Sequence, residues 1–158
     1  MSYLFDTNIF IRCKNEMPID IFHGLWQRIA DLAQNGHIFS SVKVKEEIDK
    51  GNDELVQWCN DNLPKGFFLP FDSHAEYARL MTWANGSVVF SAAAKQEFAT
   101  VADAFLVATA AAHSMKVVTF ETSDPACRKR VKIPDACIAL GVEYCSLNDV
   151  LHELGVVI

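Results

Sequence analysis

Four acidic residues, in four separate segments of the chain, are spaced so that they can act together. Asp6 and Glu121 each follow a short apolar segment, Glu47 lies on an expected helix, and Asp103 lies in the first turn of an alanine-rich helix. In a parallel α/β sheet, the carboxyl ends of the strands and the first turns of the following helices meet at one edge. We therefore expect these four carboxylates to lie close together.

A cluster of carboxylates requires a cation. Two like charges about 4 Å apart repel each other by about 4 kcal/mol at an effective dielectric constant of about 20. Hard oxygen ligands of this kind suit Mg²⁺ or Mn²⁺, and phosphate oxygens of a substrate can complete the coordination shell. Such ions activate water for attack on phosphorus. The predicted chemistry is phosphodiester hydrolysis without a protein nucleophile.

Each of these acids also has an ordinary structural explanation. Asp6 can form a turn after a strand, and Asp103 can simply begin a helix, where a negative charge is favourable. Glu47 and Glu121 can be solvated surface acids. For any one acid alone the structural explanation is the better one, but the placement of all four at one edge favours a site.

The elements that must position these acids follow from hydrophobic periodicity and from capping residues. Strands are predicted at 3–5, 38–39, 116–120 and 142–145, and helices at 20–36, from Ser40 and Ser41 to about Gly51, from Thr100 to His113, and from Ser146 to Gly155. Thr100 and Asp103 have the spacing of a capping box. Residues 52–100 are predicted to be mainly helical, without a core strand. The alternation is typical of an α/β fold with a parallel sheet.

Composition limits the class of protein. The chain has 158 residues, of which 51% are hydrophobic and 22% charged, so it is expected to form one compact domain over residues 1–158 and is not a disordered chain. The net charge of −6 requires any nucleic-acid site to be local. The five cysteines form no Cys-x-x-Cys pair and are expected to be free thiols. With no membrane-spanning segment and no signal peptide, we expect a cytoplasmic protein.

Several motifs together resemble the PIN-domain nucleases in their order and spacing. They are Leu4 to Asn8, Glu47-Ile48, Ala102 to Ala110, and Val117 to Glu121, and the segment Lys132 to Cys137 is similar to a narrower bacterial PIN-like branch. The resemblance covers nearly the whole chain. It implies a three-layer α/β/α sandwich with a central parallel sheet, and an Mg²⁺- or Mn²⁺-dependent ribonuclease of the VapC toxin type.

The resemblance also assigns the acids. Asp6, Glu47, Asp103 and Glu121 match the family's acidic metal-site positions. The last of these positions is usually Asp in a Thr-x-Asp string, whereas this chain has Glu121 there. Asp124 is therefore an alternative for the fourth position, and the number of metal ions, one or two, stays open.

Polar neighbours of the acids are assigned in the same way. Glu46 is the alternative to Glu47, its neighbour in the chain. Thr7, Asn8 and Thr119 resemble supporting positions that orient carboxylates or water.

One dense basic run follows the last acid. It consists of Arg128, Lys129, Arg130 and Lys132. These side chains are candidates to contact RNA phosphates, and the alternatives are a solvated face or an antitoxin contact. Members of the narrower branch often sit beside a small antitoxin partner, and homodimers are common in the resembled family.

Two other classes of function stay open. The first is a non-catalytic PIN-like module that binds nucleic acid or protein. The second is a receiver-like phosphoacceptor domain, which also has an acidic pocket and binds Mg²⁺. Against the receiver, no clear Asp ends a middle strand, and Glu121 stands where that class has Lys.

Overall fold

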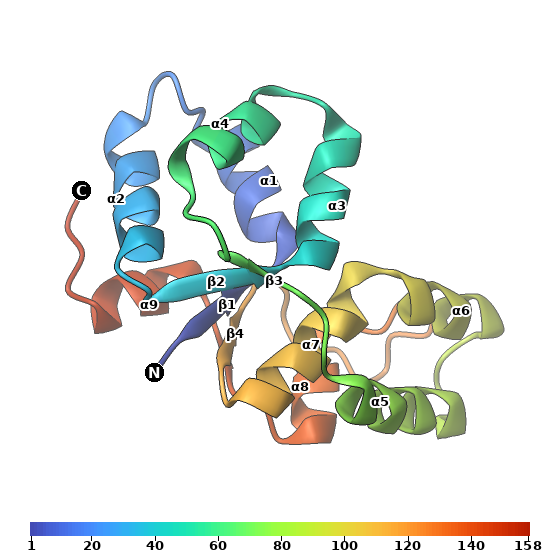
Figure 1. Ribbon diagram of the computed structural model, residues 1–158. Coiled ribbons are helices and arrows are strands. Elements are labelled where there is room, and N and C mark those ends of the chain that lie inside the picture. Colours follow the sequence, from blue (N-terminus) through green and yellow to red (C-terminus); the bar gives the residue numbers. More distant parts are fainter.

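The computed structural model describes all 158 residues, and its strands alternate with helices (Figure 1). The strands are β1 (Tyr3–Phe5), β2 (Ile38–Ser41), β3 (Phe68–Leu69), β4 (Lys116–Val118) and β5 (Tyr144–Cys145). The helices are α1 (Thr7–Glu16), α2 (His23–Gln34), α3 (Val42–Gly51), α4 (Glu54–Asn62), α5 (His74–Gly86), α6 (Ala92–Thr100), α7 (Ala102–His113), α8 (Ile133–Leu140) and α9 (Leu147–Glu153).

The sheet is parallel throughout, as predicted. Its strand order is β3-β2-β1-β4-β5, and Phe5 of β1 pairs in register with Val118 of β4. The chain therefore adds β2 and β3 on one side of β1 and then crosses over to add β4 and β5 on the other side. The direction of strand addition reverses between β1 and β4, and ligands of open α/β sheets bind in the crevice at such a reversal.

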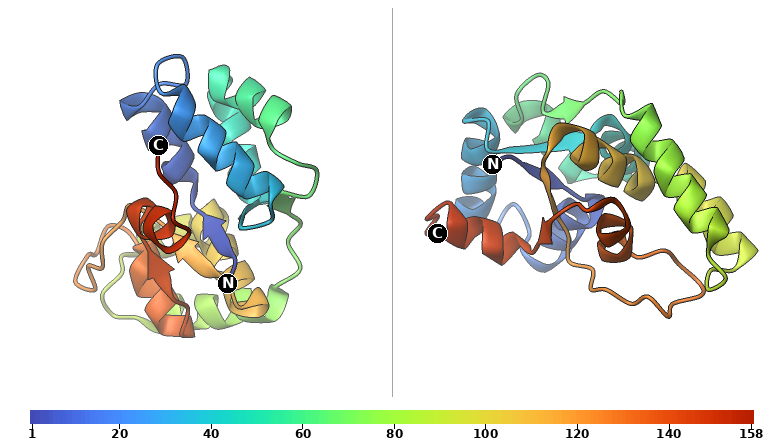
Figure 2. Two further views of the ribbon diagram at one scale, coloured as in Figure 1. Left: turned by 90° about the vertical axis from the view of Figure 1, so that its left-hand side faces the viewer. Right: turned by 90° about the horizontal axis from the view of Figure 1, so that it is seen from below.

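Helices cover both faces of the sheet, which confirms the predicted three-layer α/β/α arrangement. Figure 1 shows α1 to α4 on one side of the sheet and α5 to α8 on the other, and the left view in Figure 2 keeps this separation. The central strands β1 and β4 are apolar where both of their faces are buried, at Tyr3 to Phe5 and at Val117 and Val118, and only Lys116 at the start of β4 is partly exposed. Edge strands β3 and β5 are only two residues long and partly exposed.

Helix α7 forms the centre of one outer layer. Nearly all of its residues from Ala102 to Ala110 are buried, and the helix packs against α5, α8 and α3. Six of its twelve residues are alanine, and small side chains allow neighbouring helices to approach closely. Asp103 is therefore carried by a helix that is fixed by packing on several sides.

The start of two helices differs from the prediction. No element was predicted for residues 7–16, and only a turn at Asp6 was expected; these residues form α1, which begins directly after Asp6. The helix predicted from Asp20 begins only at His23, and Asp20 lies in a turn. Gly36 ends this region as expected, with a positive φ of 75°.

The capping box predicted at Thr100 and Asp103 is wrong. Thr100 ends α6, and its hydroxyl donates to the carbonyl of Glu97. The first turn of α7 is instead capped from another helix, since Glu47 Oε1 accepts a hydrogen bond from the Ala102 amide at 3.0 Å. A long-range contact thus replaces the local cap.

The remaining predictions are mostly confirmed. Residues 52–100 are mainly helical, except for the edge strand β3, which was not predicted. Helix α8 was also missed, although its Pro134 stands in the first turn, where proline is tolerated because the amide needs no partner. Strands β4 and β5 are shorter than predicted. Ser41 caps α3 and Ser146 caps α9, as expected.

The core is continuous through the layers. One hydrophobic cluster contains 39 buried residues. None of the helices combines the length and the apolar character that a membrane span requires.

Candidate active site

Asp6 lies at the point where the direction of strand addition reverses. Its backbone amide continues the pairing of β1 with β4 by donating to the carbonyl of Val118 at 3.0 Å. The side chain is almost completely buried, with 1% of its residue surface exposed. The hydroxyl of Thr119, which directly follows β4, donates to Asp6 Oδ2 at 3.2 Å. Asp6 directly follows β1, and its carboxylate is hydrogen-bonded by the residue that directly follows β4.

Thr119 also connects Asp6 with Glu121. While its hydroxyl donates to Asp6, its oxygen accepts a hydrogen bond from the Glu121 amide at 3.1 Å. Glu121 Oε1 accepts in turn from the amide of Ile133 at the start of α8, at 3.1 Å. The supporting role predicted for Thr119 is therefore consistent with its contacts.

Asp103 and Glu47 enter the site from two helices. Asp103 lies in the first turn of α7, is 8% exposed, and adjoins the helix terminus that Glu47 caps. Glu46, the predicted alternative, is exposed and faces Lys43 at 3.9 Å. Of the two glutamates, Glu47 is the one that the fold turns toward the acid cluster, which we define as Asp6, Glu47, Asp103 and Glu121.

Asp124, the alternative for the fourth position, lies outside the cluster. It is exposed on the loop after β4, and its amide donates to Asp135 Oδ2 at 3.0 Å. Ser123 donates to the other oxygen of Asp135. Asp135 is buried, and the sequence interpretation assigned it no role. Its place beside Pro134 in the first turn of α8 is the signal that could have identified it as an anchor for this loop.

Arg130 supplies the positive charge within the cluster. One guanidinium nitrogen, Nη2, lies 3.2 Å from Asp103 Oδ2 and 2.9 Å from Glu121 Oε2. Arg128 and Lys129 of the same basic run are exposed, whereas Lys132 is half-buried at the start of α8. The basic run therefore does not act as one surface patch, because Arg130 turns inward to the acids.

The acids perturb one another. Burial, together with the charges of Asp103 and Glu121, raises the pKa of Asp6 to about 8. Burial and the charge of Glu121 raise the pKa of Asp103 to about 6, although Arg130 opposes the rise. Groups whose protonation is strongly shifted by burial and by like charges are typical of functional sites.

Thr7 and Asn8 follow Asp6 in the first turn of α1. Thr7 Oγ1 is the single buried side-chain nitrogen or oxygen atom without a hydrogen-bond partner. An orphaned buried hydroxyl beside repelling carboxylates fits a site that takes up a further ligand. Asn8 is exposed and lines a hollow of about 400 Å³ together with Arg12, Phe120 and Glu121.

The donor set fits a divalent cation by its chemistry. Carboxylate oxygens are the ligands that Mg²⁺ and Mn²⁺ prefer, and burial together with neighbouring carboxylates raises the pKa of Asp6 and of Asp103, which a bound cation would oppose. No group of three or more acidic, histidine or cysteine side chains is arranged so that it could hold a metal ion together in this structure. In the present arrangement, Arg130 is the cation shared by Asp103 and Glu121.

The fold and the cluster define the class of protein. This is a three-layer α/β/α protein with buried acids at the carboxyl edge of a parallel sheet, at its reversal of strand order. The model of a family described as "Domain of unknown function (DUF4411)" matches residues 3–158, and the chain belongs to this family. No curated protein matches the sequence.

One solved structure shows a related fold. It is described as "Structure of FitAB bound to IR36 DNA fragment", and it matches with a TM-score of 0.52 and 20% sequence identity. The match covers 91% of this chain and 94% of the other. This likeness shows the fold, and it confirms the predicted PIN-like architecture.

Proposed function

We propose that this protein is an Mg²⁺- or Mn²⁺-dependent endoribonuclease that hydrolyses phosphodiester bonds of RNA. The observation that carries the proposal is the convergence of buried Asp6 and Asp103 with Glu121 in the crevice between β1 and β4. A purely structural role does not explain why the fold buries Asp6 and Asp103, whose pKa values are raised by burial and by neighbouring carboxylates. A site that binds a divalent cation and a phosphate does explain it.

Each residue of the acid cluster has its own role in the proposed function. Asp6 and Asp103 are the proposed metal ligands, with Glu121 and Glu47 completing the acidic positions. When bound, the ion would activate water and stabilise negative charge on the phosphate. Thr119 holds the Asp6 carboxylate by its hydrogen bond, and Glu47 holds the first turn of α7 and with it Asp103.

The proposed substrate is RNA. Two features support this choice: the resemblance to PIN-domain ribonucleases, and the exposure of Arg128 and Lys129 on the loop that also carries Glu121. These two side chains are free to contact phosphates, whereas Arg130 faces the acids. The FitAB structure contains a DNA fragment, so DNA belongs in the test as a competing substrate.

The biological setting is proposed from the same resemblance. We propose that the protein is the toxin of a toxin–antitoxin pair, with a small cognate antitoxin as its partner and a cytoplasmic location. Homodimerisation is also proposed, since homodimers are common in the resembled family.

One specific observation favours a second function, a non-catalytic binding module. Arg130 already neutralises part of the acidic charge, and no three of the acids are arranged so that they could hold a metal ion together in this structure. The receiver-like alternative is not proposed, because the strand order of receiver domains is 2-1-3-4-5 and this sheet has the order 3-2-1-4-5.

The test is cleavage of labelled single-stranded RNA and DNA pools by the partner-free protein, with Mn²⁺ or with EDTA. Asp6→Asn and Asp103→Asn are the test variants, and Asp124→Asn is the matched control because it removes an exposed acid outside the cluster. We expect Mn²⁺-dependent cleavage of RNA that both test variants lose and the control retains. Cleavage that survives in both test variants would indicate a contaminating nuclease, and Mn²⁺ binding without cleavage would favour the binding module.

A further inference from the structure

A second feature lies beside the acid cluster, where α3 faces the start of α7. It is a hollow of about 460 Å³, and its lining includes Lys43, Glu47 and Lys50 from α3 and Ala102 and Phe105 from α7. Glu47 belongs to both places, because its carboxylate bonds to the Ala102 amide while its charge acts on Asp103. The hollow therefore adjoins the acid cluster at Glu47.

The ring of Phe105 is held in place by two other aromatic rings. Tyr77 stacks on it with ring centres 4.8 Å apart at an angle of 22°, and Phe71 meets it edge-on at 5.0 Å. Tyr77 is itself fixed, since its hydroxyl donates to the carbonyl of Ala99 at 2.6 Å. Phe105 is only half-buried, unlike its neighbours on α7, so part of the ring lies outside the core.

A charged side chain also lies on the Phe105 ring. Lys43 Nζ lies over the Phe105 ring, 4.9 Å from its centre. A lysine ammonium on an aromatic face at the surface is held weakly, by about 0.5–1 kcal/mol. A planar ligand group can therefore replace it on the ring without unfolding anything.

The two lysines of the hollow are also available for anions. Lys43 has only the exposed Glu46 as an acidic partner, at 3.9 Å, and Lys50 forms no ion pair. Lys45 on the same helix differs, because it is paired with Asp49 and does not line the hollow. The hollow thus combines a fixed aromatic ring with two cations. That is the combination with which proteins bind single-stranded nucleic acid.

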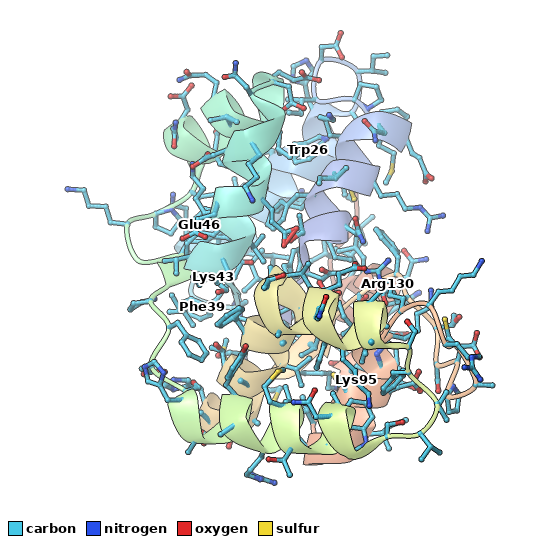
Figure 3. All side chains as sticks on the ribbon, turned by 90° about the vertical axis from the view of Figure 1, so that its right-hand side faces the viewer. Trp26, Phe39, Lys43, Glu46, Lys95 and Arg130 are labelled. Carbon is cyan, nitrogen blue, oxygen red and sulfur yellow. The ribbon has the colours of Figure 1, made fainter.

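Figure 3 shows where the two ends of the site lie. Lys43, with Phe39 and Glu46 near it, lies on one side of the face formed by α3 and α7, and Arg130 lies on the other side. Arg130 bonds to Asp103, which follows Ala102 of the hollow's lining in the chain, so Asp103 connects Arg130 with the hollow. A strand that crosses this face would pass the acids and then reach the hollow.

We propose that this hollow is a nucleotide subsite for single-stranded RNA, next to the bond that the acid cluster cleaves. The base stacks on Phe105, and Lys43 and Lys50 contact the flanking phosphates. This inference rests on the proposed function. Stacking tolerates every base, so the subsite accepts a base of any identity but requires that a base be present.

The test is an abasic scan. Short labelled oligoribonucleotides, each lacking one base at a different position, are cleaved in Mn²⁺ by the wild type, by Phe105→Leu and by Lys45→Gln. Leucine keeps apolar volume on α7 but has no aromatic face, and thermal unfolding checks that this variant folds. Lys45→Gln is the control, since it removes a lysine of the same helix outside the hollow.

We expect one abasic position near the cleaved bond to lower kcat/KM of the wild type and of Lys45→Gln about tenfold, in line with the energy of stacking one base. The same abasic position should lower kcat/KM of Phe105→Leu only slightly, because this variant has no aromatic ring on which the base could stack. Cleavage without any sensitive position, or an equal cost in Phe105→Leu, would overturn the subsite and leave the proposed nuclease standing.

A binding measurement separates the two proposals. Fluorescence anisotropy of the intact oligonucleotide in EDTA compares the wild type with Phe105→Leu, Lys43→Gln and Lys45→Gln. If nothing is cleaved but the first two variants bind more weakly and the third does not, the subsite stands and the hydrolytic function falls. If nothing is cleaved and all four proteins bind alike or not at all, the subsite is overturned as well.

Discussion

Replacement of Arg130 by glutamine should destabilise the metal-free protein, because it removes the cation from two nearly buried acids. The side chains of Asp103 and Glu121 are 11% and 10% exposed, and both bond to the same guanidinium nitrogen, whose side chain is 39% exposed. Breaking a buried ion pair costs about 3–5 kcal/mol, whereas a surface pair contributes about 0–1 kcal/mol. Since the acids are buried and the arginine is partly solvated, we expect a loss of about 2 kcal/mol.

The assay is urea denaturation at pH 8 in EDTA, with Arg128→Gln as the matched control. Arg128 is an exposed arginine two residues away and forms no ion pair. We expect Arg130→Gln to lower the midpoint at an unchanged slope, and Arg128→Gln to stay within about 0.5 kcal/mol of the wild type.

The second part of this prediction concerns the effect of Mn²⁺ on the stability of Arg130→Gln. A ligand that binds only the folded state at 100 times its dissociation constant adds about 2.7 kcal/mol of stability. Saturating Mn²⁺ should therefore restore most of what Arg130→Gln loses, because the ion supplies the missing positive charge. The reasoning is refuted if Arg130→Gln is as stable as the wild type in EDTA, or if Arg128→Gln loses as much.

Three further predictions concern the acids. The pKa of Asp6 in the folded protein is about 8, well above its ordinary value of 3.8, so the native state binds this proton more tightly than the unfolded chain does. The stability of the metal-free protein should therefore fall as pH rises from about 5 to 8. Urea denaturation should show a smaller fall in stability over this pH range for Asp6→Asn than for the wild type. Glu47→Gln should lower RNA cleavage about 10–100-fold, in the range found for groups that position metal ligands, while Glu46→Gln should change the initial rate about twofold or less. Glu121→Gln should weaken Mn²⁺ binding, measured by electron paramagnetic resonance, whereas Asp124→Asn should not, because the Glu121 carboxylate lies in the acid cluster beside Arg130 and Asp124 is exposed outside it.

The sequence predicted the carboxyl edge of the sheet well, for a physical reason. A strand buried on both faces needs a run of apolar residues, so the first polar residue after it marks the strand end. Asp6 follows β1 in this way, whereas β4 ends at Val118 and not, as predicted, at Phe120. Because parallel strands end at the same edge, the convergence of Asp6, Asp103 and Glu121 followed from their positions in the chain.

Contacts between distant segments were not predictable from local patterns. The cap of α7 comes from Glu47, 55 residues earlier in the chain, and so the capping box proposed at Thr100 failed. Arg130 lies in a run of basic residues whose composition does not show which side chain turns inward. Asp135 anchors the loop that holds Ser123, and this role depends on where α8 packs. Such interactions are set by tertiary structure, which local sequence does not encode.

The measurement that tests the central claim most directly is Mn²⁺ binding by the acid cluster, followed by electron paramagnetic resonance at pH 8. The wild type and Asp124→Asn are compared with Asp6→Asn and Asp103→Asn, and thermal unfolding confirms that all four proteins are folded. Saturable binding by the first two, weakened about tenfold or more in the last two, is the predicted result. Equal binding by all four proteins, or no binding by the wild type, would contradict the assignment of this cluster as a divalent-metal site.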